Sequence, residues 1–460
     1  MGNEIIRKTD GNNSKDKRRI NINNLLMKKV AFHTLGCKLN FAESSDLARR
    51  FTQNNYEQVS SKEFADVYVI NTCTVTQVAE KKCRNAIRVA NHINPNAIIA
   101  VIGCFAQLNP KEIAEIEGVD IILGNADKHK LFEYIESKEK FDEHFKEVVP
   151  IDNVKEFVPS YSFEDRTRSF LKIQDGCDYF CSYCAIPFAR GRSRSDTIEN
   201  TIKKAYELEK EGKKEVVLTG VNIGDFGKHQ GEDFFSLIKE LDKVEHIERY
   251  RISSIEPNLI TNEIIDFVST SRSFLPHFHI PLQGGTNFLL ERMKRKYNRE
   301  LFEDRVRYIK KIMPSAFIAA DIILGFPGES EEEFNETIAF IESLPLSALH
   351  VFTYSERPNS LAINFEGKVP MNIRKKRSLI MQDISNKKKK EFYIQNIGYK
   401  ASVLWEEDND KGMMYGFTDN YIRISRKFDK SLINQITYET LSYINPKTHN
   451  FELINFETEI

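Results

Sequence analysis

The chain has 460 residues, of which 41% are hydrophobic and 29% are charged. This length predicts two to four domains, and this composition excludes disorder over the whole chain. The formal net charge of −1 excludes nucleic-acid binding through overall charge, so any basic surface must be local. Seven cysteines without a secretory signal argue against a disulfide-linked secreted protein. No apolar run is long enough to span a bilayer, and we expect a cytoplasmic protein.

Residues 1–27 are polar and rich in Asn, Lys and Arg. They contain no apolar segment of the kind found in secretory signals. This composition predicts a disordered basic arm. Two interpretations of the arm remain open, a solvated tail and a segment that contacts RNA.

Strand-like and helix-like patterns alternate from residue 28 to residue 138. Apolar runs predict strands, and amphipathic stretches between them predict helices. The predicted strands cover residues 29–35, 66–71, 97–102 and 119–123, and the predicted helices cover residues 41–54, 79–92 and 110–116. This order predicts an N-terminal domain with a doubly wound parallel α/β sheet.

Three cysteines follow three of these strands. Cys37, Cys73 and Cys104 come after the first, second and third predicted strands. Ligands gather outside the carboxyl ends of parallel strands, so we expect these thiols, here called the N-terminal cysteine trio, to converge. For any one of them alone, a buried inert thiol is the simpler interpretation. Cys83 lies inside a predicted helix, and we expect it to bind nothing.

Residues 139–166 are charged and aperiodic, which predicts a linker. The alternation then resumes over residues 167–392. Its predicted strands cover residues 170–174, 215–220, 250–255, 278–282, 316–324 and 349–354. Six strand–helix units are too few for a closed eight-stranded barrel, so we predict a partial (β/α)6 barrel of the TIM type. Polar and small residues at the strand ends suit a small polar ligand, although each alone is ordinary turn chemistry.

The strongest motif follows the first predicted barrel strand. Cys177, Cys181 and Cys184, here called the loop cysteine trio, have the spacing C-x3-C-x2-C. Three thiolates at this spacing hold three irons of a [4Fe–4S] cluster and leave the fourth iron open for a substrate. The alternatives are a structural zinc site with a distant fourth ligand and three unrelated core cysteines.

The last part of the chain changes character twice. Residues 365–392 predict a basic helix, whose cations either face solvent or contact phosphates. Residues 396–458 carry short strands separated by turns, which predicts a small antiparallel β-barrel. Barrels of this kind bind single-stranded RNA through aromatic and cationic side chains. The candidate RNA-binding residues are Tyr415, Phe417, Tyr421 and Arg423. The alternative is that the aromatic residues belong to the core.

The two cysteine trios and the small barrel behind them together resemble the radical S-adenosylmethionine (SAM) methylthiotransferases. The resemblance covers roughly residues 28–455. It rests on the loop motif and on the stretches at residues 33–40, 69–75, 103–107, 187–191 and 325–329. It implies a methylthiotransferase N-terminal domain over residues 28–138, a radical SAM core over residues 167–392 and a TRAM-like RNA-binding barrel over residues 396–458.

The resemblance also implies cofactors and partners. It implies two [4Fe–4S] clusters, one on each trio, of which the loop cluster cleaves SAM and the N-terminal cluster carries sulfur that a second SAM methylates. The residues implied in SAM binding are Tyr183, Gly220, Ser254 and Gln283. The partners are tRNA and an electron donor of the flavodoxin or ferredoxin type, the sulfur donor is left open, and no membrane is involved. The chemistry belongs to the clusters, so no side chain is expected to act as acid or base.

Within the family, the stretches at residues 33–38, 251–256 and 350–355 are most similar to one branch. That branch methylthiolates C2 of N6-threonylcarbamoyladenosine beside the anticodon of tRNA. Two other branches act on isopentenyladenosine in tRNA and on an aspartate of a ribosomal protein. A third alternative is an RNA-binding protein with metal sites and no catalysis.

Overall fold

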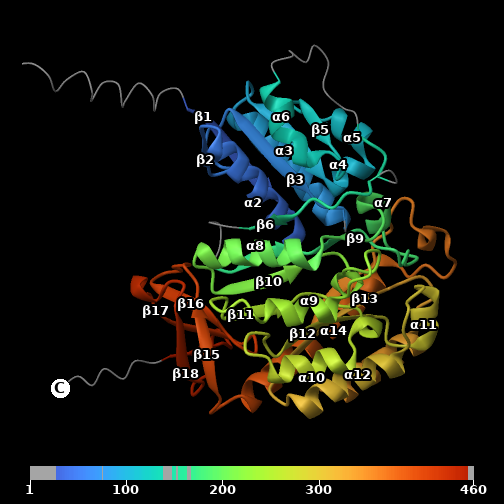
Figure 1. Cartoon of the computed structure of the whole chain (residues 1–460). Coiled ribbons are helices and arrows are strands. Elements are labelled where there is room, and N and C mark those ends of the chain that lie inside the picture. The colour runs from blue at the N-terminus through green and yellow to red at the C-terminus, as the bar shows by residue number, and fades with distance from the viewer. Residues whose placement is uncertain (1–26, 75, 138–147, 152–153, 163–166, 454–460) are drawn as a thin grey trace, which may run out of the picture.

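The computed structural model describes residues 27–74, 76–137, 148–151, 154–162 and 167–453. The basic arm predicted over residues 1–27 therefore lies outside the described residues except for Met27, as do residues 139–147, 152–153 and 163–166 of the predicted linker. The N-terminal α/β domain lies at the top of Figure 1, the barrel in the middle and the C-terminal sheet at the lower left.

The N-terminal domain is built on a five-stranded parallel sheet with the order β2-β1-β3-β4-β5. Its strands are β1 (Lys28–Thr34), β2 (Tyr56–Val59), β3 (Val67–Thr72), β4 (Ile98–Gly103) and β5 (Ile121–Leu123). Its helices are α2 (Lys38–Gln53), α3 (Gln77–Ile93), α4 (Cys104–Leu108), α5 (Pro110–Ala114), η1 (Lys128–Lys130) and α6 (Leu131–Glu136). Successive residues of β3 point to opposite faces of the sheet. Val69 and Ile70 accordingly belong to separate cores on the two faces. The predicted doubly wound sheet is confirmed, with β2 as an additional edge strand.

The central domain is a partial barrel of six parallel strands, as predicted. The strands are β7 (Ser169–Lys172), β10 (Glu215–Thr219), β11 (Arg249–Ile252), β12 (His277–Gln283), β13 (Phe317–Leu324) and β14 (Ala348–Thr353). They form two sheets, β11-β10-β7 and β12-β13-β14, which isolated bridges at Tyr250–Phe274 and Ser254–His279 connect. The short strand β6 (Ser160–Tyr161) pairs antiparallel with β7.

Helices cover the outside of this barrel (Figure 1). They are α8 (Ile198–Lys210), α9 (Phe234–Leu241), α10 (Asn262–Thr270), α11 (Asn287–Arg292), α12 (Arg299–Ile312), α13 (Glu331–Ser343) and α14 (Met371–Gln395). Two short strands, β8 (Gln174–Asp175) and β9 (Arg194–Ser195), pair on either side of α7 (Ile186–Arg190). Four 3-10 turns complete the described elements, η3 (Ile223–Asp225), η4 (Pro257–Leu259), η5 (Leu361–Asn364) and η6 (Lys430–Leu432).

The alternation of side chains along the strands makes the barrel interior polar. Tyr250 and Ile252 of β11 belong to the apolar core against the helices. Arg251, between them, therefore points to the opposite side, where its guanidinium pairs with Glu215 of β10. Charged and polar side chains of several strands are thus collected in the interior of the barrel.

The C-terminal domain is a curled five-stranded sheet with the order β18-β15-β16-β17-β19. Its strands are β15 (Lys400–Trp405), β16 (Met413–Thr418), β17 (Arg423–Lys427), β18 (Ile436–Thr440) and β19 (Phe451–Glu452). All described pairs are antiparallel except β17–β19. No pairing between the two end strands occurs among the described residues, so the predicted small barrel is a half-barrel. Its core includes Trp405 together with Phe317 of the central barrel.

The helix predicted at residues 365–392 corresponds to α14, which begins later, at Met371, and several of its cations are structural. Arg374 donates to the carbonyl oxygen of Tyr354 at 3.0 Å, and Arg377 pairs with Glu329 at 2.7 Å. Lys388 donates to a backbone carbonyl in the same way. These buried cations hold the last barrel helix in place, so neither solvent nor phosphate is their partner. None of the helices in the described ranges combines the length and apolarity needed to cross a bilayer.

Candidate metal and substrate site

The loop cysteine trio lies between β8 and α7. Cys181 is buried, whereas Cys177 and Cys184 are half-buried. Backbone amides point at two of the sulfurs: the N–H of Tyr179 donates to Cys177 Sγ at 3.5 Å, and the N–H of Ile186 donates to Cys184 Sγ at 3.4 Å. N–H groups aimed at sulfur favour the thiolate, so this loop suits a thiolate-ligated metal group.

Burial raises the pKa of the Cys177 and Cys184 thiols to about 12. The thiols are therefore protonated in the metal-free chain. A metal bound to these sulfurs would replace the protons, because the thiolate is the form that ligates metals.

Arg295 ties the cysteine loop to the barrel. Its Nη1 donates to Cys181 Sγ at 3.0 Å and to the Tyr183 hydroxyl at 3.2 Å, and its Nη2 forms an ion pair with Glu256. The hydroxyl of Tyr297 accepts from Arg295 Nε at 3.1 Å and itself donates to a carbonyl of β12. A buried guanidinium at this distance from sulfur stabilises negative charge on the ligands and on a bound cluster.

The residues predicted to hold SAM lie at the ends of the elements that surround the loop. The Tyr183 ring packs edge-on against Phe326 at 6.5 Å between ring centres. A Cβ at Gly220 would lie 2.9 Å from the carbonyl oxygen of Gln174, so close packing already explains this glycine. The remaining candidates are Ser254, which bridges to β12, and Gln283, which ends β12 with a φ of 66°. The SAM contacts of all four residues stay predictions.

The N-terminal cysteine trio lies at one edge of its sheet. Cys37 precedes α2, Cys73 follows β3, and Cys104 is the first residue of α4 after β4. A Cβ at Gly36 would lie 2.8 Å from Cys73 Cβ, so the turn that carries Cys37 touches Cys73. Asn125 Nδ2 donates to Cys104 Sγ at 3.5 Å. The sheet topology therefore brings these cysteines to neighbouring positions although they are far apart in the sequence.

Neither trio is arranged around a single ion. In a tetrahedral zinc site with Zn–S bonds of about 2.3 Å, the sulfurs lie roughly 3.8 Å apart. Over the described ranges, three potential ligand atoms lie within 4.8 Å of one another only at His279, Asp321 and His350. This distribution argues against a structural zinc site at either trio.

A buried ion network joins the two trios. Arg190 Nη1 donates to Asp175 at 2.9 Å, and Arg190 Nη2 donates to Glu43 of α2 at 3.1 Å. Burial raises the pKa of the Cys37 thiol, and the charge of Arg190 offsets part of this increase. Asp175 lies two residues before Cys177 in the sequence. One guanidinium thus interacts with the surroundings of both trios.

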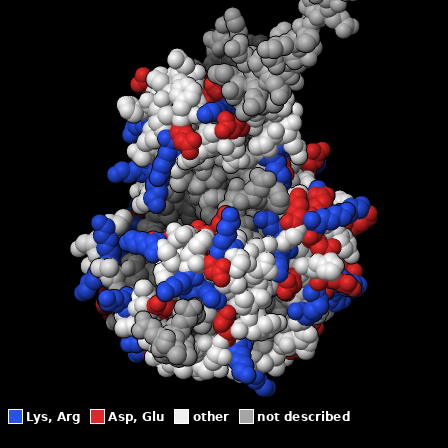
Figure 2. Space-filling model, turned by 90° about the vertical axis from the view of Figure 1, so that its left-hand side faces the viewer, with Lys and Arg blue, Asp and Glu red and all other residues white. Residues whose placement is uncertain are grey.

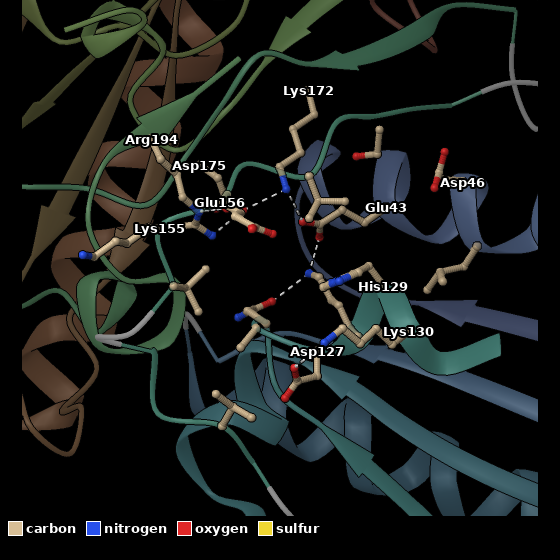
Figure 3. A pocket seen from close by; sticks show the side chains of 18 residues that line it. Glu43, Asp46, Asp127, His129, Lys130, Lys155, Glu156, Lys172, Asp175 and Arg194 are labelled. Atoms are coloured by element: carbon tan, nitrogen blue, oxygen red, sulfur yellow. Dashed lines mark hydrogen bonds and ion pairs between the residues drawn. The ribbon is translucent and has the colours of Figure 1, made fainter. Parts of the chain in front are cut away.

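Figure 3 shows the other side of this network, where Lys172 points at Glu43 and Arg194 points at Asp175. Burial by itself would raise the pKa of the Glu43 carboxyl. The charges of Arg190, Lys128 and Lys172 lower this pKa by a larger amount, so it is well below its usual value. A cavity of about 410 Å³ lies against these groups. Because its buried charges pair with one another, we read this cavity as part of the domain interface.

A second polar group lies in the barrel interior. His279 of β12 and His350 of β14 flank Asp321 of β13: Asp321 Oδ1 lies 2.7 Å from His279 Nε2 and 3.1 Å from His350 Nδ1. Burial raises the pKa of Asp321, but the hydrogen bonds and charges of the two histidines lower it more, so it is well below its usual value. The three residues come from separate strands, so their proximity is a product of the barrel alone.

The candidate RNA-binding residues lie on one continuous surface of β16, β17 and the turn between them. The Arg423 guanidinium lies 3.9 Å above the Tyr415 ring, and Arg423 is exposed. Phe417 and Tyr421 are half-buried and stack at 4.9 Å between ring centres. Phe417 is the cross-strand partner of Arg423, and Arg168 of the barrel lies 4.5 Å above the Phe417 ring, so this surface extends to the barrel. Figure 2 shows a hollow between the N-terminal domain and the rest of the molecule, with Lys and Arg gathered along its left rim.

The residues that position the trios were not predicted from the sequence. Arg295 and Tyr297 lie in a polar stretch without a motif, and Arg190 lies in a motif that gave it no role. Their partners are distant in the sequence: 114 residues separate Arg295 from Cys181. The sequence did not indicate that these arginines are buried, and burial is the property that would have pointed to a positioning role.

Comparisons with known proteins agree with this architecture. The model of the uncharacterized protein family UPF0004 matches residues 29–124, and that of the radical SAM superfamily matches residues 171–341. The solved structure of the radical S-adenosylmethionine methyltransferase TsrM from Kitasatospora setae, with cobalamin and a [4Fe-4S] cluster bound, is similar with a TM-score of 0.53 at 13% identity, covering 85% of this chain and 81% of that one. At that identity the similarity bears on the fold alone.

Several proteins are much more similar to this chain in sequence than this solved structure is. The threonylcarbamoyladenosine tRNA methylthiotransferase MtaB of Bacillus subtilis is 42% identical over 89% of this chain and 93% of its own length. The protein of the same name from Aquifex aeolicus is 41% identical over 87% of this chain and 97% of its own length. A tRNA-2-methylthio-N(6)-dimethylallyladenosine synthase from Pelotomaculum thermopropionicum is 32% identical over 90% of this chain and 95% of its own length.

Proposed function

The chain belongs to the MtaB-like radical SAM tRNA methylthiotransferases, and from this premise we propose that it methylthiolates C2 of N6-threonylcarbamoyladenosine beside the anticodon. The observation that supports this substrate is the difference in sequence identity between relatives named for different substrates. Five relatives named for threonylcarbamoyladenosine are 42%, 41%, 36%, 36% and 34% identical to this chain, whereas three named for dimethylallyladenosine are 32%, 33% and 31% identical. The chain is an enzyme that uses SAM and [4Fe–4S] chemistry on tRNA.

We assign the two trios separate jobs. A [4Fe–4S] cluster with bound SAM supplies a 5′-deoxyadenosyl radical and a second cluster supplies sulfur. Cys177, Cys181 and Cys184 would hold the first, and Arg295 beside Cys181 would stabilise its negative charge. The second would be held by Cys37, Cys73 and Cys104.

Placement is the main contribution of the protein to such a reaction, because the target base, SAM and sulfur must meet at one point. The Arg190 network supports this assignment, since it fixes α2 of the N-terminal domain to the loop before Cys177. Tyr183, Gly220, Ser254 and Gln283 are proposed to hold SAM at the barrel side of that junction. An electron donor of the flavodoxin or ferredoxin type completes the reaction, and we assign no sulfur donor.

The RNA is proposed to lie across the hollow between the domains. A base beside the anticodon must leave its stack to reach an enclosed site. The exposed Arg423, the half-buried Tyr415 ring beneath it and the basic rim in Figure 2 suit a phosphate backbone and an unstacked base. On this proposal residues 28–138 carry the sulfur site, residues 167–392 the radical site and residues 396–458 the RNA contact.

Nucleoside mass spectrometry of tRNA from a deletion strain tests the substrate. We expect the 2-methylthio form of N6-threonylcarbamoyladenosine to disappear and the unmethylthiolated form to accumulate. Re-expression of the wild-type chain should restore it, and re-expression of Cys104→Ala should not. If the methylthio form persists in a strain without a related enzyme, or if methylthio-isopentenyladenosine disappears instead, the proposed substrate is wrong.

A further inference from the structure

A small cavity opens in the barrel interior beside the N-terminal cysteine trio. It has a volume of about 200 Å³ and begins at Gly36, the residue before Cys37. Cavities that enclose whole drug-sized ligands measure roughly 300–1,000 Å³, so this one suits a substituent and not a nucleotide. Its lining residues are Gly36, Lys38, Phe41, Arg168, Phe170, Val217, Arg251, His277 and Tyr421. The cavity therefore lies where all three domains meet.

The charged lining of this cavity is cationic. Two of its three cations have partners of their own. Arg168 forms an ion pair with Glu406 at 2.9 Å, and Arg251 pairs with Glu215 at 2.7 Å. Arg251 also donates to two backbone carbonyls of the C-terminal domain. The hydrogen-bonding capacity of both guanidiniums is thus largely used by the protein.

Lys38 is different. It is the first residue of α2 and lines the cavity, and in the described part of the chain no hydrogen bond or ion pair engages its ammonium group. A cation at a helix N-terminus is unfavourable with respect to the helix dipole. An enclosed ammonium without a hydrogen-bonded partner is also costly. This position is therefore suited to an anion from outside the chain.

The electrostatic potential inside the cavity also favours an anion. Burial by itself would raise the pKa of the Tyr421 phenol. The charges of Arg168, Lys38 and Arg251 lower this pKa by a larger amount, so the net shift is downward. His277 also lines the cavity and stays neutral, because burial and the surrounding cations hold its pKa well below its usual value. An anionic substituent would therefore find positive potential here.

We propose that this cavity, with Lys38 as its anion-binding residue, receives the carboxylate of the threonylcarbamoyl group and so selects it over an uncharged N6 substituent. The inference rests on the proposed function, which supplies the substrate. On an adenine, C2 and C6 flank N1 and N6 is bonded to C6, so a substituent on N6 must be held close to the atom that receives sulfur. The position of the cavity beside Cys37 satisfies this requirement.

The test compares two RNAs and two charges. Anaerobically reconstituted full-length enzyme is titrated with an anticodon stem–loop that carries N6-threonylcarbamoyladenosine, and with the same RNA whose carboxylate is a methyl ester. A charge-assisted hydrogen bond predicts that the wild-type enzyme binds the acid roughly 10-fold to 100-fold more tightly than the ester. Lys38→Met should bind both RNAs with the weaker affinity, because only the acid–ammonium pair is lost.

Three further variants make the result specific. Lys62→Met removes an exposed lysine of the same domain and should keep the wild-type preference. Lys38→Arg should keep much of the preference, and Lys38→Gln replaces the Met variant if that protein does not fold. Iron content and the visible spectrum must match those of the wild-type protein.

Two results would overturn the inference. One is an unchanged acid-over-ester preference in folded Lys38→Met and Lys38→Gln. The other is a wild-type enzyme that does not discriminate between acid and ester. If that wild-type enzyme still methylthiolates the acid RNA, the inference fails and the proposed function stands. If it methylthiolates neither RNA, both fail.

Discussion

The two cysteine trios are brought together by different parts of the structure. The loop trio spans residues 177–184 and is held by amides of its own loop together with Arg295. The N-terminal trio spans residues 37–104 and depends on β1, β3 and β4 ending at the same edge of one sheet. The loop trio is thus determined mainly by local conformation, and the N-terminal trio by the fold of a domain.

This difference has consequences for how each trio can fail. Loss of one thiol should affect only the chemistry of the cluster that the thiol holds. Loss of a residue in the Arg190 network should affect both, because this network lies between the trios. Backbone strain at the sheet edge should weaken the N-terminal trio alone.

The largest effect is expected from Cys181→Ala. This substitution removes the buried ligand of the loop trio, so SAM cleavage and methylthio transfer should both become undetectable. Chromatographic assay of 5′-deoxyadenosine with dithionite as reductant measures the first activity. Iron content should fall to roughly half, because one of two clusters is lost. Substantial SAM cleavage by this variant would contradict the assignment of the loop trio.

Much of this comparison was predictable from the sequence. Contiguous apolar runs predicted β1, β3, β4 and β5, and the spacing of the loop cysteines predicted an open-sided cluster. The edge strand β2 was missed because its middle residues, Glu57 and Gln58, are polar and β2 has no apolar run. Arg190 was given no role because its carboxylate partner Glu43 is 147 residues away. Local patterns predict elements, but partners of buried charges come only from the tertiary structure.

The second largest effect is expected from Arg190→Met. Removal of this guanidinium leaves Glu43 and Asp175 buried with fewer counter-charges, which should cost about 3–5 kcal/mol in the free energy of unfolding. Arg88→Met, at an exposed arginine of α3, is the matched control and should change stability by about 0.5 kcal/mol or less. Urea unfolding followed by circular dichroism measures both. Equal stability of the two variants would show that the network does not join the domains.

A smaller and more local effect is expected from Gly103→Ala. Gly103 has a φ of 97°, and a Cβ there would lie 2.5 Å from Asn71 Oδ1. The strain should cost about 1–3 kcal/mol and loosen the N-terminal trio beside Cys104. Gly212→Ala is the control, since its φ is 73° but no atom lies within 4 Å of the added Cβ. We expect iron loss during chelator challenge to be faster in Gly103→Ala than in Gly212→Ala, while SAM cleavage is kept by both.

The smallest effect concerns pH. The pKa of Glu43 is lowered in the folded chain, because Arg190, Lys128 and Lys172 outweigh the opposing effect of burial. Its stabilisation is therefore complete above the unfolded pKa of about 4.3 and is lost as the pH falls toward the folded value. Between pH 5 and pH 3.5 the wild-type chain should lose about 1 kcal/mol more stability than Glu43→Gln, which cannot titrate there. Parallel unfolding curves of the two proteins across this range would contradict the assignment.

The central claim is that the two trios do separable chemistry, and Cys37→Ala tests it most directly. Both products, 5′-deoxyadenosine and the methylthiolated nucleoside, are measured in one anaerobic reaction with an anticodon stem–loop carrying N6-threonylcarbamoyladenosine. We predict that this variant continues to cleave SAM and forms no methylthio product, with iron content reduced to roughly half. Loss of both activities in a folded Cys37→Ala protein, or methylthio transfer without this cysteine, would contradict the account.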